Sequence, residues 1–521
     1  MTIFKLGIDH LTTALLEQIL VGELDLTIDR DAADKIRRSK SYVDAIVDRE
    51  EVVYGINTGF GPLCTTIISA ADTQRLQENI LRSHSVGVSE AVPIRVARTM
   101  MVTKLHSLCQ GYSGISLEVL ERILWLFEHH YTPFVPIQGS VGASGDLAPL
   151  AHLFLPLIGL GKLHDGDQYV DTMEVYQKEG LASLELGAKE GLALINGTQF
   201  IVSYAVMGVS RMHNLLDNAD IIGAMSLEGI LGSAAPFDPD LHSLRPFSGA
   251  QYVAHRLKML LDKSEMVASH ANCGRVQDPY SIRCMPQVHG TSRHAWQHLA
   301  EMLETELNAV TDNPIIFNAN KTISGGNFHG QLLALPLDYA TLAAAELGNI
   351  SDRRSYLLIE GKSGLPRLLM TNTGINSGFM IPQYTSAALV SENKSLCFPA
   401  SADSIPTSLG QEDHVSMGSI SGRKFNQVLG NLENILAVEL VSAAQAFDYR
   451  KPMKSGPILD ACHELIREKI DHAEEDRVFA HDIAAAAELI SSGAIVTKAD
   501  ETATNQNIDF KGQYHELYRL H

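Results

Sequence analysis

Residues 425–447, with the sequence FNQVLGNLENILAVELVSAAQAF, decide the fold class of this chain. An α-helix turns once in about 3.6 residues, and the apolar positions here recur every three or four residues over about six turns. No proline interrupts the stretch, so it predicts one long helix with a buried face. The positions that make this face are Phe425, Val428, Leu429, Leu432, Ile435, Leu436, Leu440, Ala443, Ala444 and Phe447.

Three further stretches show the same helical spacing, at about residues 198–231, 292–310 and 334–360. Small side chains at 343–345 allow neighbouring helices to approach closely. Strand signals are short and sparse, and residues 51–54 (EVVY) are an example. The sequence therefore predicts an all-α protein built on a long central helical bundle.

The composition is acidic, with 41 Lys and Arg against 61 Asp and Glu, a formal net charge of −20. This balance argues against a nucleic-acid partner, because such binding depends on basic residues. It also argues against docking on an anionic membrane surface. With 45% hydrophobic and 20% charged residues, the chain is apolar enough to bury a core. We expect a large soluble protein.

The cysteines and histidines indicate neither a disulfide framework nor a metal site. Six cysteines are scattered without CxxC pairs, which predicts reduced thiols in the cytoplasm. The 21 histidines include no HExxH motif or zinc spacing. The N-terminus lacks the pattern of a signal peptide. The longest uncharged run, residues 192–210, contains several polar side chains, so we interpret it as the buried start of a soluble helix.

Five loops between the predicted helices have specific patterns, and loops on a rigid scaffold commonly carry function. They are YGINTGFG at 54–61, GSVGASGD at 139–146, QDPYSIR at 277–283, GGNFHG at 325–330 and GQEDH at 410–414.

The loop at 139–146 fits neither common glycine-rich motif. Its glycines are not spaced as GxGxxG, and Ser144 lacks the GxSxG arrangement. It could be a flexible turn. Alternatively, the unhindered nitrogen of Gly145 could attack the carbonyl of Ala143. Loss of water from that ring, and of a second water from the Ser144 side chain, would leave an exocyclic methylidene, which is an electrophile.

The segment GSVGASGDLAPL resembles the signature of the aromatic amino-acid ammonia-lyases. These enzymes form a methylidene-imidazolone (MIO) group autocatalytically. The resemblance extends from Tyr54 to Arg450 and includes all five loops in order. It implies MIO formed from Ala143, Ser144 and Gly145, with no nucleotide or metal cofactor.

The resemblance also implies a fold and an assembly. Members of the family are all-α homotetramers related to fumarase and aspartase. Residues 1–196 would form an N-terminal domain that bears MIO. Residues 197–521 would form the long-helix bundle domain with a C-terminal helical segment. The expected partner is a small amino-acid substrate, without nucleic acid or membrane.

By resemblance, Tyr54 would remove the β-proton of the substrate and Tyr280 would position substrate and MIO. A half-buried packing role is the alternative for Tyr54. Arg283 would clamp the substrate carboxylate, because a guanidinium matches a carboxylate with two hydrogen bonds. It could instead belong to a surface ion pair. Asn196 would bind near the carboxylate and MIO, and it could also cap the following helix.

Three more residues are assigned by resemblance. Gln277 and Phe328 would line the pocket, although a phenylalanine is more often part of a core. Asp146 would assist MIO formation, or it could be an acidic residue favoured by a helix N-terminus.

Substrate choice depends on two further positions. The pair Ser83-His84 is similar to histidine-directed members of the family, although some tyrosine-directed relatives share it. Glu412 matches a glutamate that faces the substrate imidazole, where a carboxylate can accept the ring N–H. It could also be a solvated loop acid. The run Phe328-His329-Gly330-Gln331 departs from the histidine-directed pattern, which is Phe-His-Ala-Glu.

We therefore expect the deamination of L-histidine to trans-urocanate and ammonia. Three alternatives remain open at this point. The first is deamination of tyrosine or phenylalanine. The second is an MIO-dependent aminomutase, which returns ammonia to the β-carbon. The third is a helical assembly protein without MIO.

Overall fold

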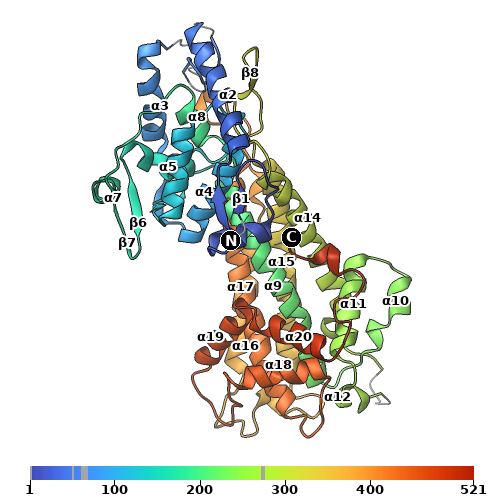
Figure 1. The fold of residues 1–521 in the computed structure, drawn as a ribbon. Coiled ribbons are helices and arrows are strands. Elements are labelled where there is room, and N and C mark those ends of the chain that lie inside the picture. The colour runs from blue at the N-terminus through green and yellow to red at the C-terminus, as the bar shows by residue number, and fades with distance from the viewer. Residues whose placement is uncertain (1–2, 50–51, 60, 62–67, 272–275) are drawn as a thin grey trace.

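The computed structural model describes residues 3–49, 52–59, 61, 68–271 and 276–521. It is mostly helical, which confirms the predicted all-α class. Four long helices run through the middle of the molecule, between N-terminal elements at one end and C-terminal elements at the other (Figure 1). They are α9 (Gln199–Gly229), α14 (Met285–Leu307), α15 (Gln331–Ile359) and α17 (Gly418–Asp448).

These helices confirm the predicted stretches, with differences at their ends. The helix α17 contains all of 425–447 and begins seven residues earlier, at Gly418. The helix α14 begins at Met285, before the predicted 292. Its first turn includes Pro286, a residue that a helix tolerates at its start, where the missing N–H has no intrahelical partner.

The helices α9, α15 and α17 run parallel to one another, and α14 runs the other way. Side chains near their first turns therefore gather at one end of the bundle, and those near their last turns gather at the other. The close approaches that show this join Gly330 to Ile201 and Ser416 at the first end, and Gly229 to Leu358 and Ala446 at the second.

The N-terminal part combines shorter helices with small sheets. Its helices are α1 (Thr13–Leu20), α2 (Arg30–Asp48), α3 (Ala70–His84), α4 (Ile94–Cys109), α5 (Leu117–Glu128), α6 (Leu147–Phe154), α7 (Thr172–Glu179) and α8 (Glu190–Ile195). In its first sheet, β1 (Ile3–Lys5) and β2 (Asp25–Thr27) are parallel. In the second, β3 (Val88–Ala91) and β5 (Pro136–Gln138) are antiparallel. The third is antiparallel and has three strands, β4 (Thr132–Pro133), β6 (Lys162–Asp165) and β7 (Gln168–Asp171).

The remaining elements surround the long helices. The strands β8 (Ile315–Asn318) and β9 (Lys321–Ile323) form an antiparallel hairpin. The helices are α10 (Pro239–Ser243), α11 (Ser248–Leu260), α12 (Glu265–Ala268), α13 (Tyr280–Arg283), α16 (Met380–Leu396), α18 (Pro457–Arg467), α19 (Phe479–Ser491) and α20 (Ala494–Asn505). Among the described residues no single helix has the length and hydropathy to cross a membrane, and one pair, α19 and α20, bent by 56°, meets both criteria together.

The strand predicted at 51–54 is wrong for the residues that the structure describes, and Glu51 lies outside them. Residues 52–53 have no regular structure, and Tyr54 begins a turn. The side chain of Asn57 accepts a hydrogen bond from Val53 N at 3.0 Å, and Ile56 N donates to Val53 O at 3.2 Å. These local hydrogen bonds turn the chain where apolar residues alone suggested an extended segment.

The packing of α9 on α17 gives a test of the bundle. A Cβ added at Gly208 would lie 2.3 Å from a ring carbon of Phe425, whose side chain is fully buried. We expect Gly208→Ala to lower the free energy of unfolding by about 1–3 kcal/mol, because the clash outweighs the gain in helix propensity. Urea unfolding at a fixed protein concentration measures it.

Gly430 provides the matched control in α17. A Cβ there would have an ordinary contact, 3.7 Å from Arg211 Nη2. Gly430→Ala should raise the free energy of unfolding by about 0.5–1 kcal/mol through helix propensity alone. Equal effects of the two substitutions would contradict the close approach at Gly208.

Candidate active site

The Ala143–Asp146 loop lies directly against the segment that leads into α9. Gly145 forms an isolated parallel bridge with Gly197, and Asp146 N donates to Gly197 O at 2.7 Å. The φ angle of Gly145 is +72°, and a Cβ there would lie 2.1 Å from Gly197 O. The loop can therefore approach this segment only with glycine at position 145.

Asp146 connects the same loop to the first turn of α9. Its Oδ2 accepts hydrogen bonds from Phe200 N at 3.1 Å and Ile201 N at 3.0 Å, and Ser140 Oγ donates to Oδ1 at 3.3 Å. The carboxyl group is fully buried. Burial raises the pKa of Asp146 to about 7, although the three hydrogen bonds act in the opposite direction.

Asp146 therefore caps the first turn of α9, a role that the sequence analysis considered for Asn196. Asn196 lies at the C-terminal end of α8, and its side chain donates to Leu192 O at 3.5 Å. The expectation that Asn196 caps α9 is wrong, because the side chain of Asp146, and not that of Asn196, accepts hydrogen bonds from the free N–H groups of that helix. Asn196 is left facing the neighbouring cavity.

The other side of the loop is held by the start of α17. Ser416 Oγ donates to Gly142 O at 3.2 Å, Met417 N donates to Val141 O at 3.0 Å, and Ser419 Oγ donates to Ser140 O at 2.7 Å. The loop thus lies between the N-termini of α9 and α17, with the start of α15 beside them. Helix N-termini carry partial positive charge, so this end of the bundle favours anionic groups.

A cavity of about 370 Å³ opens beside the loop. Five of the residues singled out in the sequence line it, namely Tyr54, His84, Ser144, Asn196 and Glu412. Its apolar wall comes from Leu76, Ile80, Leu147 and Leu192. The mixture of an apolar wall and a few converging polar groups is typical of a site for a small molecule.

Glu412 is fixed by three hydroxyl groups. Its Oε1 accepts from Ser144 Oγ at 3.0 Å. Its Oε2 accepts from Thr407 Oγ1 at 2.9 Å and from Ser408 Oγ at 2.8 Å. The half-buried carboxylate is therefore directed at the loop and is not a solvated acid. Thr407 and Ser408 were missed in the sequence, because hydroxyl residues are common in ordinary loops.

His84 lies across the cavity from Glu412, at the end of α3. Burial lowers the pKa of His84, while its hydrogen bond with the Ile80 carbonyl and the charge of Glu412 act in the opposite direction. The ring is therefore neutral at pH 7 and can both donate and accept a hydrogen bond. Its Nδ1 lies 3.0 Å from Ser83 Oγ.

Phe328 does not line this cavity, although its loop is close to the site. The side chain is half-buried, one turn before α15. The neighbouring His329 stacks on His414 with ring centroids 5.6 Å apart, and its Nε2 lies 3.3 Å from His414 O. The loops at 325–330 and 410–414 are therefore side by side.

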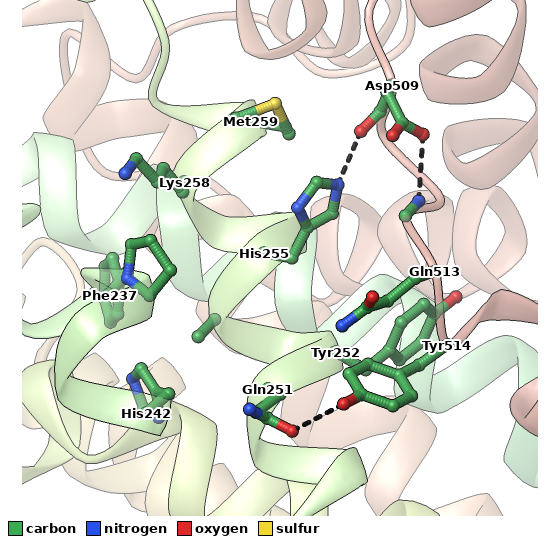
Figure 2. A pocket seen from close by; sticks show the side chains of 13 residues that line it. Phe237, His242, Gln251, Tyr252, His255, Lys258, Met259, Asp509, Gln513 and Tyr514 are labelled. Atoms are coloured by element: carbon green, nitrogen blue, oxygen red, sulfur yellow. Dashed lines mark hydrogen bonds between the residues drawn. The ribbon is translucent and has the colours of Figure 1, made fainter. Parts of the chain in front are cut away.

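Another cavity, of about 420 Å³, lies between α11 and the C-terminal segment (Figure 2). Two pairs of its polar groups are hydrogen-bonded, since Tyr514 OH donates to Gln251 Oε1 at 2.8 Å and His255 Nε2 lies 2.6 Å from Asp509 O. None of the residues predicted for the site lines it. Across the described part of the chain, no three His, Cys, Asp or Glu side chains are grouped to hold a metal ion.

Gln277, Tyr280 and Arg283 lie at the opposite end of α9 from Ser144. Asp278, between them, accepts from Ser233 N at 2.7 Å, just beyond the last turn of α9. The helix has 31 residues. At 1.5 Å per residue, the two ends of α9 are about 45 Å apart. Within a single chain, Gln277, Tyr280 and Arg283 are therefore too far from Ser144 to share its cavity.

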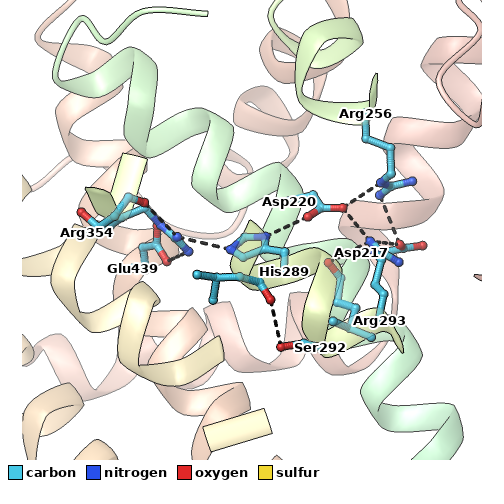
Figure 3. A network of polar contacts seen from close by, with 11 residues as sticks. Asp217, Asp220, Arg256, His289, Ser292, Arg293, Arg354 and Glu439 are labelled. Atoms are coloured by element: carbon cyan, nitrogen blue, oxygen red, sulfur yellow. Dashed lines mark hydrogen bonds and ion pairs between the residues drawn. The ribbon is translucent and has the colours of Figure 1, made fainter. Parts of the chain in front are cut away.

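The segment with Tyr280 rests on a buried polar network (Figure 3). Arg354 Nη1 donates to Ser281 O at 3.4 Å, and Arg354 is paired with Glu439, Nε to Oε1, at 2.6 Å. His289 lies between Arg354 and Asp220, with Nδ1 2.8 Å from Asp220 Oδ1. Asp220 in turn pairs with two further arginines of the network. The backbone beneath Tyr280 is therefore anchored in the core.

The two side chains above this anchor lie together, Tyr280 exposed and Arg283 half-buried with its Nε buried and without a hydrogen-bond partner. The Arg283 guanidinium lies 4.6 Å from the centroid of the Tyr280 ring. Tyr280 is 71% exposed, which is unusual for a large aromatic side chain on an anchored segment. Gln277 beside them is also exposed. These residues can contact a molecule outside this chain.

One residue next to the cavity was missed in the sequence. Lys104 on α4 is 1% exposed, and its Nζ donates to Asn196 O. A signal was present, because Lys104 lies between the apolar residues Met100–Val102 and Leu105. Its partner lies 92 positions away, however, and no local pattern reveals such a contact.

The buried Asp146 predicts a specific pH dependence. Its folded pKa of about 7 is raised above the ordinary value of 3.8, so the folded state holds a proton that the unfolded state has lost between about pH 4 and 7. Over that range the free energy of unfolding should fall as pH rises, by at most about 1.4 kcal/mol per pH unit.

Asp146→Asn keeps an acceptor oxygen for the first turn of α9 but cannot ionise. In the Ser144→Ala background, urea unfolding of both proteins from pH 4 to 8 should show the Asn variant gaining stability relative to Asp146 as pH rises. Parallel pH profiles would contradict the raised pKa.

Known proteins resemble this chain over most of its length. The model of the aromatic amino acid lyase family matches residues 11–468. A histidine ammonia-lyase of Sorangium cellulosum (strain So ce56) is 48% identical over 502 residues, which are 94% of this chain and 98% of that relative. The crystal structure of histidine ammonia-lyase from Trypanosoma cruzi has a TM-score of 0.90 at 40% identity, covering 100% of this chain and 98% of that one.

A structure of tyrosine aminomutase from Streptomyces globisporus has a TM-score of 0.89 at 32% identity, and it covers 95% of this chain and 98% of its own. The same fold thus holds relatives with different named activities. The family match spans most of the sequence and includes the loop, the cavity and the long helices described above. The chain belongs to the aromatic amino acid lyase family.

Proposed function

We propose that this chain is an MIO-dependent ammonia-lyase that converts L-histidine to trans-urocanate and ammonia. The observation that carries the proposal is the hydrogen bond from Ser144 Oγ to Glu412 Oε1 at 3.0 Å. It brings the MIO-forming tripeptide and the substrate-selecting acid into one cavity with His84. The Sorangium relative, whose printed name is histidine ammonia-lyase, supports the same choice at 48% identity.

The residues present fit MIO. Gly145 has the positive φ of a glycine that approaches another backbone, and Ala143 adds only a methyl group beside Ser144. Hydroxyl and backbone groups from α9 and α17 hold the loop from two sides. The group would supply an electrophile that makes the amino group of the substrate a better leaving group.

The side chains in the cavity would divide the rest of the reaction. Tyr54 would take the β-proton of the substrate. A phenol is a weak base unless positive charge stabilises its anion, and the N-termini of α9, α15 and α17 supply such charge at this end of the bundle. Asn196, 4% exposed, would orient the substrate beside the loop.

His84 and Glu412 would select the imidazole. A substrate N–H could donate to Glu412, and the second ring nitrogen could meet the neutral His84. Beside a phenyl ring, the carboxylate of Glu412 would lose a hydrogen-bond partner on desolvation, which is costly. This pair therefore favours histidine over phenylalanine.

A substrate panel tests the proposed reaction. L-histidine should give the ultraviolet absorbance of urocanate with release of ammonia, and L-phenylalanine and L-tyrosine should be poor substrates. Glu412→Gln should lower kcat/KM for histidine by about 10–100-fold, because it removes a charge-assisted hydrogen bond. Ser144→Ala should abolish turnover. Faster release of coumarate from tyrosine than of urocanate from histidine would overturn the assignment.

We further propose that the site is completed by another copy of this chain in a homotetramer. Arg283 and Tyr280 would clamp the substrate carboxylate in the cavity of a neighbouring subunit, because about 45 Å of α9 separates them from their own Ser144. Gln277 would accompany them. Phe328, on the loop beside 410–414, would face substrate from a neighbouring subunit or its own.

An exposed apolar face on α15 supports this assembly. Its side chains follow the helical spacing along one face, and each is about half exposed or more. A row of this kind is typical of a subunit interface. A second copy is the occupant that would also bring the missing arginine. The row consists of Leu332, Leu335, Tyr339, Leu342 and Tyr356.

Mixed oligomers test the shared site. Ser144→Ala and Arg283→Ala should each be inactive alone. When the two variants are produced together, sites with an intact Ser144 and an intact Arg283 should form, and about a quarter of the wild-type activity should return by random assembly. Mixing after purification, without subunit exchange, is the control. No recovery in verified mixed oligomers would contradict the shared site.

Two smaller expectations belong to the same proposal. We place the boundary between an MIO-bearing region and the bundle at residue 196, where α8 ends and the segment into α9 begins. A cytoplasmic location agrees with the cysteines, because none of the four described ones, such as the buried Cys109 and Cys462, forms a disulfide.

A further inference from the structure

We propose that Lys104 is a positioning residue for MIO formation, because it holds the Asn196–Gly197 peptide against which Gly145 is placed for ring closure. The inference rests on the proposed function, since it concerns how the Ala143–Gly145 loop matures. Lys104 would touch neither substrate nor the reacting atoms. It would act through the segment between α8 and α9.

The contacts of Lys104 place it directly beneath this segment. Its Nζ donates to Asn196 O, and the next carbonyl, Gly197 O, accepts from Asp146 N at 2.7 Å. A Cβ on Gly145 would lie 2.1 Å from Gly197 O. One peptide unit therefore separates the Lys104 ammonium from the backbone on which the loop rests.

Because of Gly197, the position of the Asn196–Gly197 peptide depends on a contact from another part of the chain. Its φ angle is +136°, a conformation that side chains rarely adopt. The Asn196–Gly197 peptide lies between two helices, since Asn196 N still donates to Leu192 O at 3.1 Å in α8, and Thr198 O accepts from Val202 N at 2.9 Å at the start of α9. A charged donor fixed in the core can hold such a peptide in one place.

Burying the Lys104 ammonium in the core costs free energy. Lys104 is 1% exposed, and Asp312, the acid whose charge acts on it, is already paired with Lys189 at 2.5 Å. Burial lowers the pKa of Lys104 to about 7, and the charge of Asp312 opposes this change only in part. An apolar side chain would avoid this cost. The compensating interaction that the structure offers is the hydrogen bond to Asn196 O.

Ring closure needs a loop that is held in place, because the two reacting groups, Gly145 N and the Ala143 carbonyl, belong to the same short loop and must be brought into contact. The nitrogen of Gly145 bonds to the carbonyl carbon of Ala143, and the Gly145 N–H proton moves to the carbonyl oxygen. That hydroxyl leaves as water with the Ser144 N–H proton. A second water forms from the Ser144 hydroxyl group and the Cα proton of Ser144, and it leaves the exocyclic methylidene. No oxidant or reductant is required, so correct placement of the loop is the main demand on the protein.

The test compares the rate of maturation in variants of full-length protein. Wild type and variants are synthesised by cell-free translation, so that each chain starts unmodified, and intact mass is followed over time for the loss of two waters. Lys104→Met, which keeps the length of the side chain but not the donor, should mature at least about tenfold more slowly. Lys104→Arg keeps a charged donor and should recover most of the wild-type rate.

Thr103→Val is the matched control on the same helix. Thr103 is also buried, at 3% exposure, but its hydroxyl bonds only to carbonyls of its own helix, at Thr99 and Met100. It should mature at the wild-type rate. Ser144→Ala, which cannot mature, supplies the circular-dichroism spectrum and oligomer size of a folded immature protein for comparison.

The outcomes separate the two proposals. A wild-type chain that never loses two waters would overturn the proposed function. A wild type that matures, together with a folded Lys104→Met that matures equally fast, would overturn the role of Lys104 alone. If Lys104→Met does not reach the folded reference, Lys104→Gln, which keeps a neutral donor, replaces it. Wild-type maturation in that folded variant would also overturn the proposal.

Discussion

Gly145 and Gly197 meet backbone to backbone, and the rest of the site is arranged around this contact. The approach leaves no room for a side chain on Gly145. It places the N–H of Asp146 on Gly197 O and carries the Asp146 carboxylate to the first turn of α9. One contact therefore fixes the Ala143–Asp146 loop, the start of a central helix and one wall of the cavity.

The parallel arrangement of α9, α15 and α17 gives this end of the bundle a positive electrostatic character. Three helix N-termini meet there, so their partial positive charges add. Two acids at this end are held by donors, Asp146 by backbone N–H groups and Glu412 by hydroxyls. A net acidic chain can thus keep a locally favourable place for a carboxylate substrate.

Much of the fold could be predicted from sequence, because apolar spacing depends on neighbours three and four residues apart. The stretch at 425–447 became the core of α17. The first two turns of α14 were missed, since Met285–Thr291 contains a proline, a glycine and few apolar residues. The strand expected at 51–54 failed because the Asn57 side chain turns the backbone.

The site was only partly predictable, and distance along the chain explains the difference. Motifs within one loop identified Ser144 and Glu412, which the structure brings within 3.0 Å. Contacts between distant segments had no local signature, as for Asp146 with α9 and Lys104 with Asn196. Sequence also could not reveal that Arg283 lies beyond the reach of its own Ser144.

The length of α9 has a consequence for how such chains can change over evolution. Every residue inserted into this helix would lengthen it by about 1.5 Å and rotate everything beyond by about 100°. The network of Asp220 and Arg354 beneath Tyr280 would then lose its register with α14 and α17. Substitutions inside α9 can accumulate singly, whereas insertions and deletions would have to be compensated in three other helices at once. The length of α9 is therefore tied to the lengths of the three helices that pack with it.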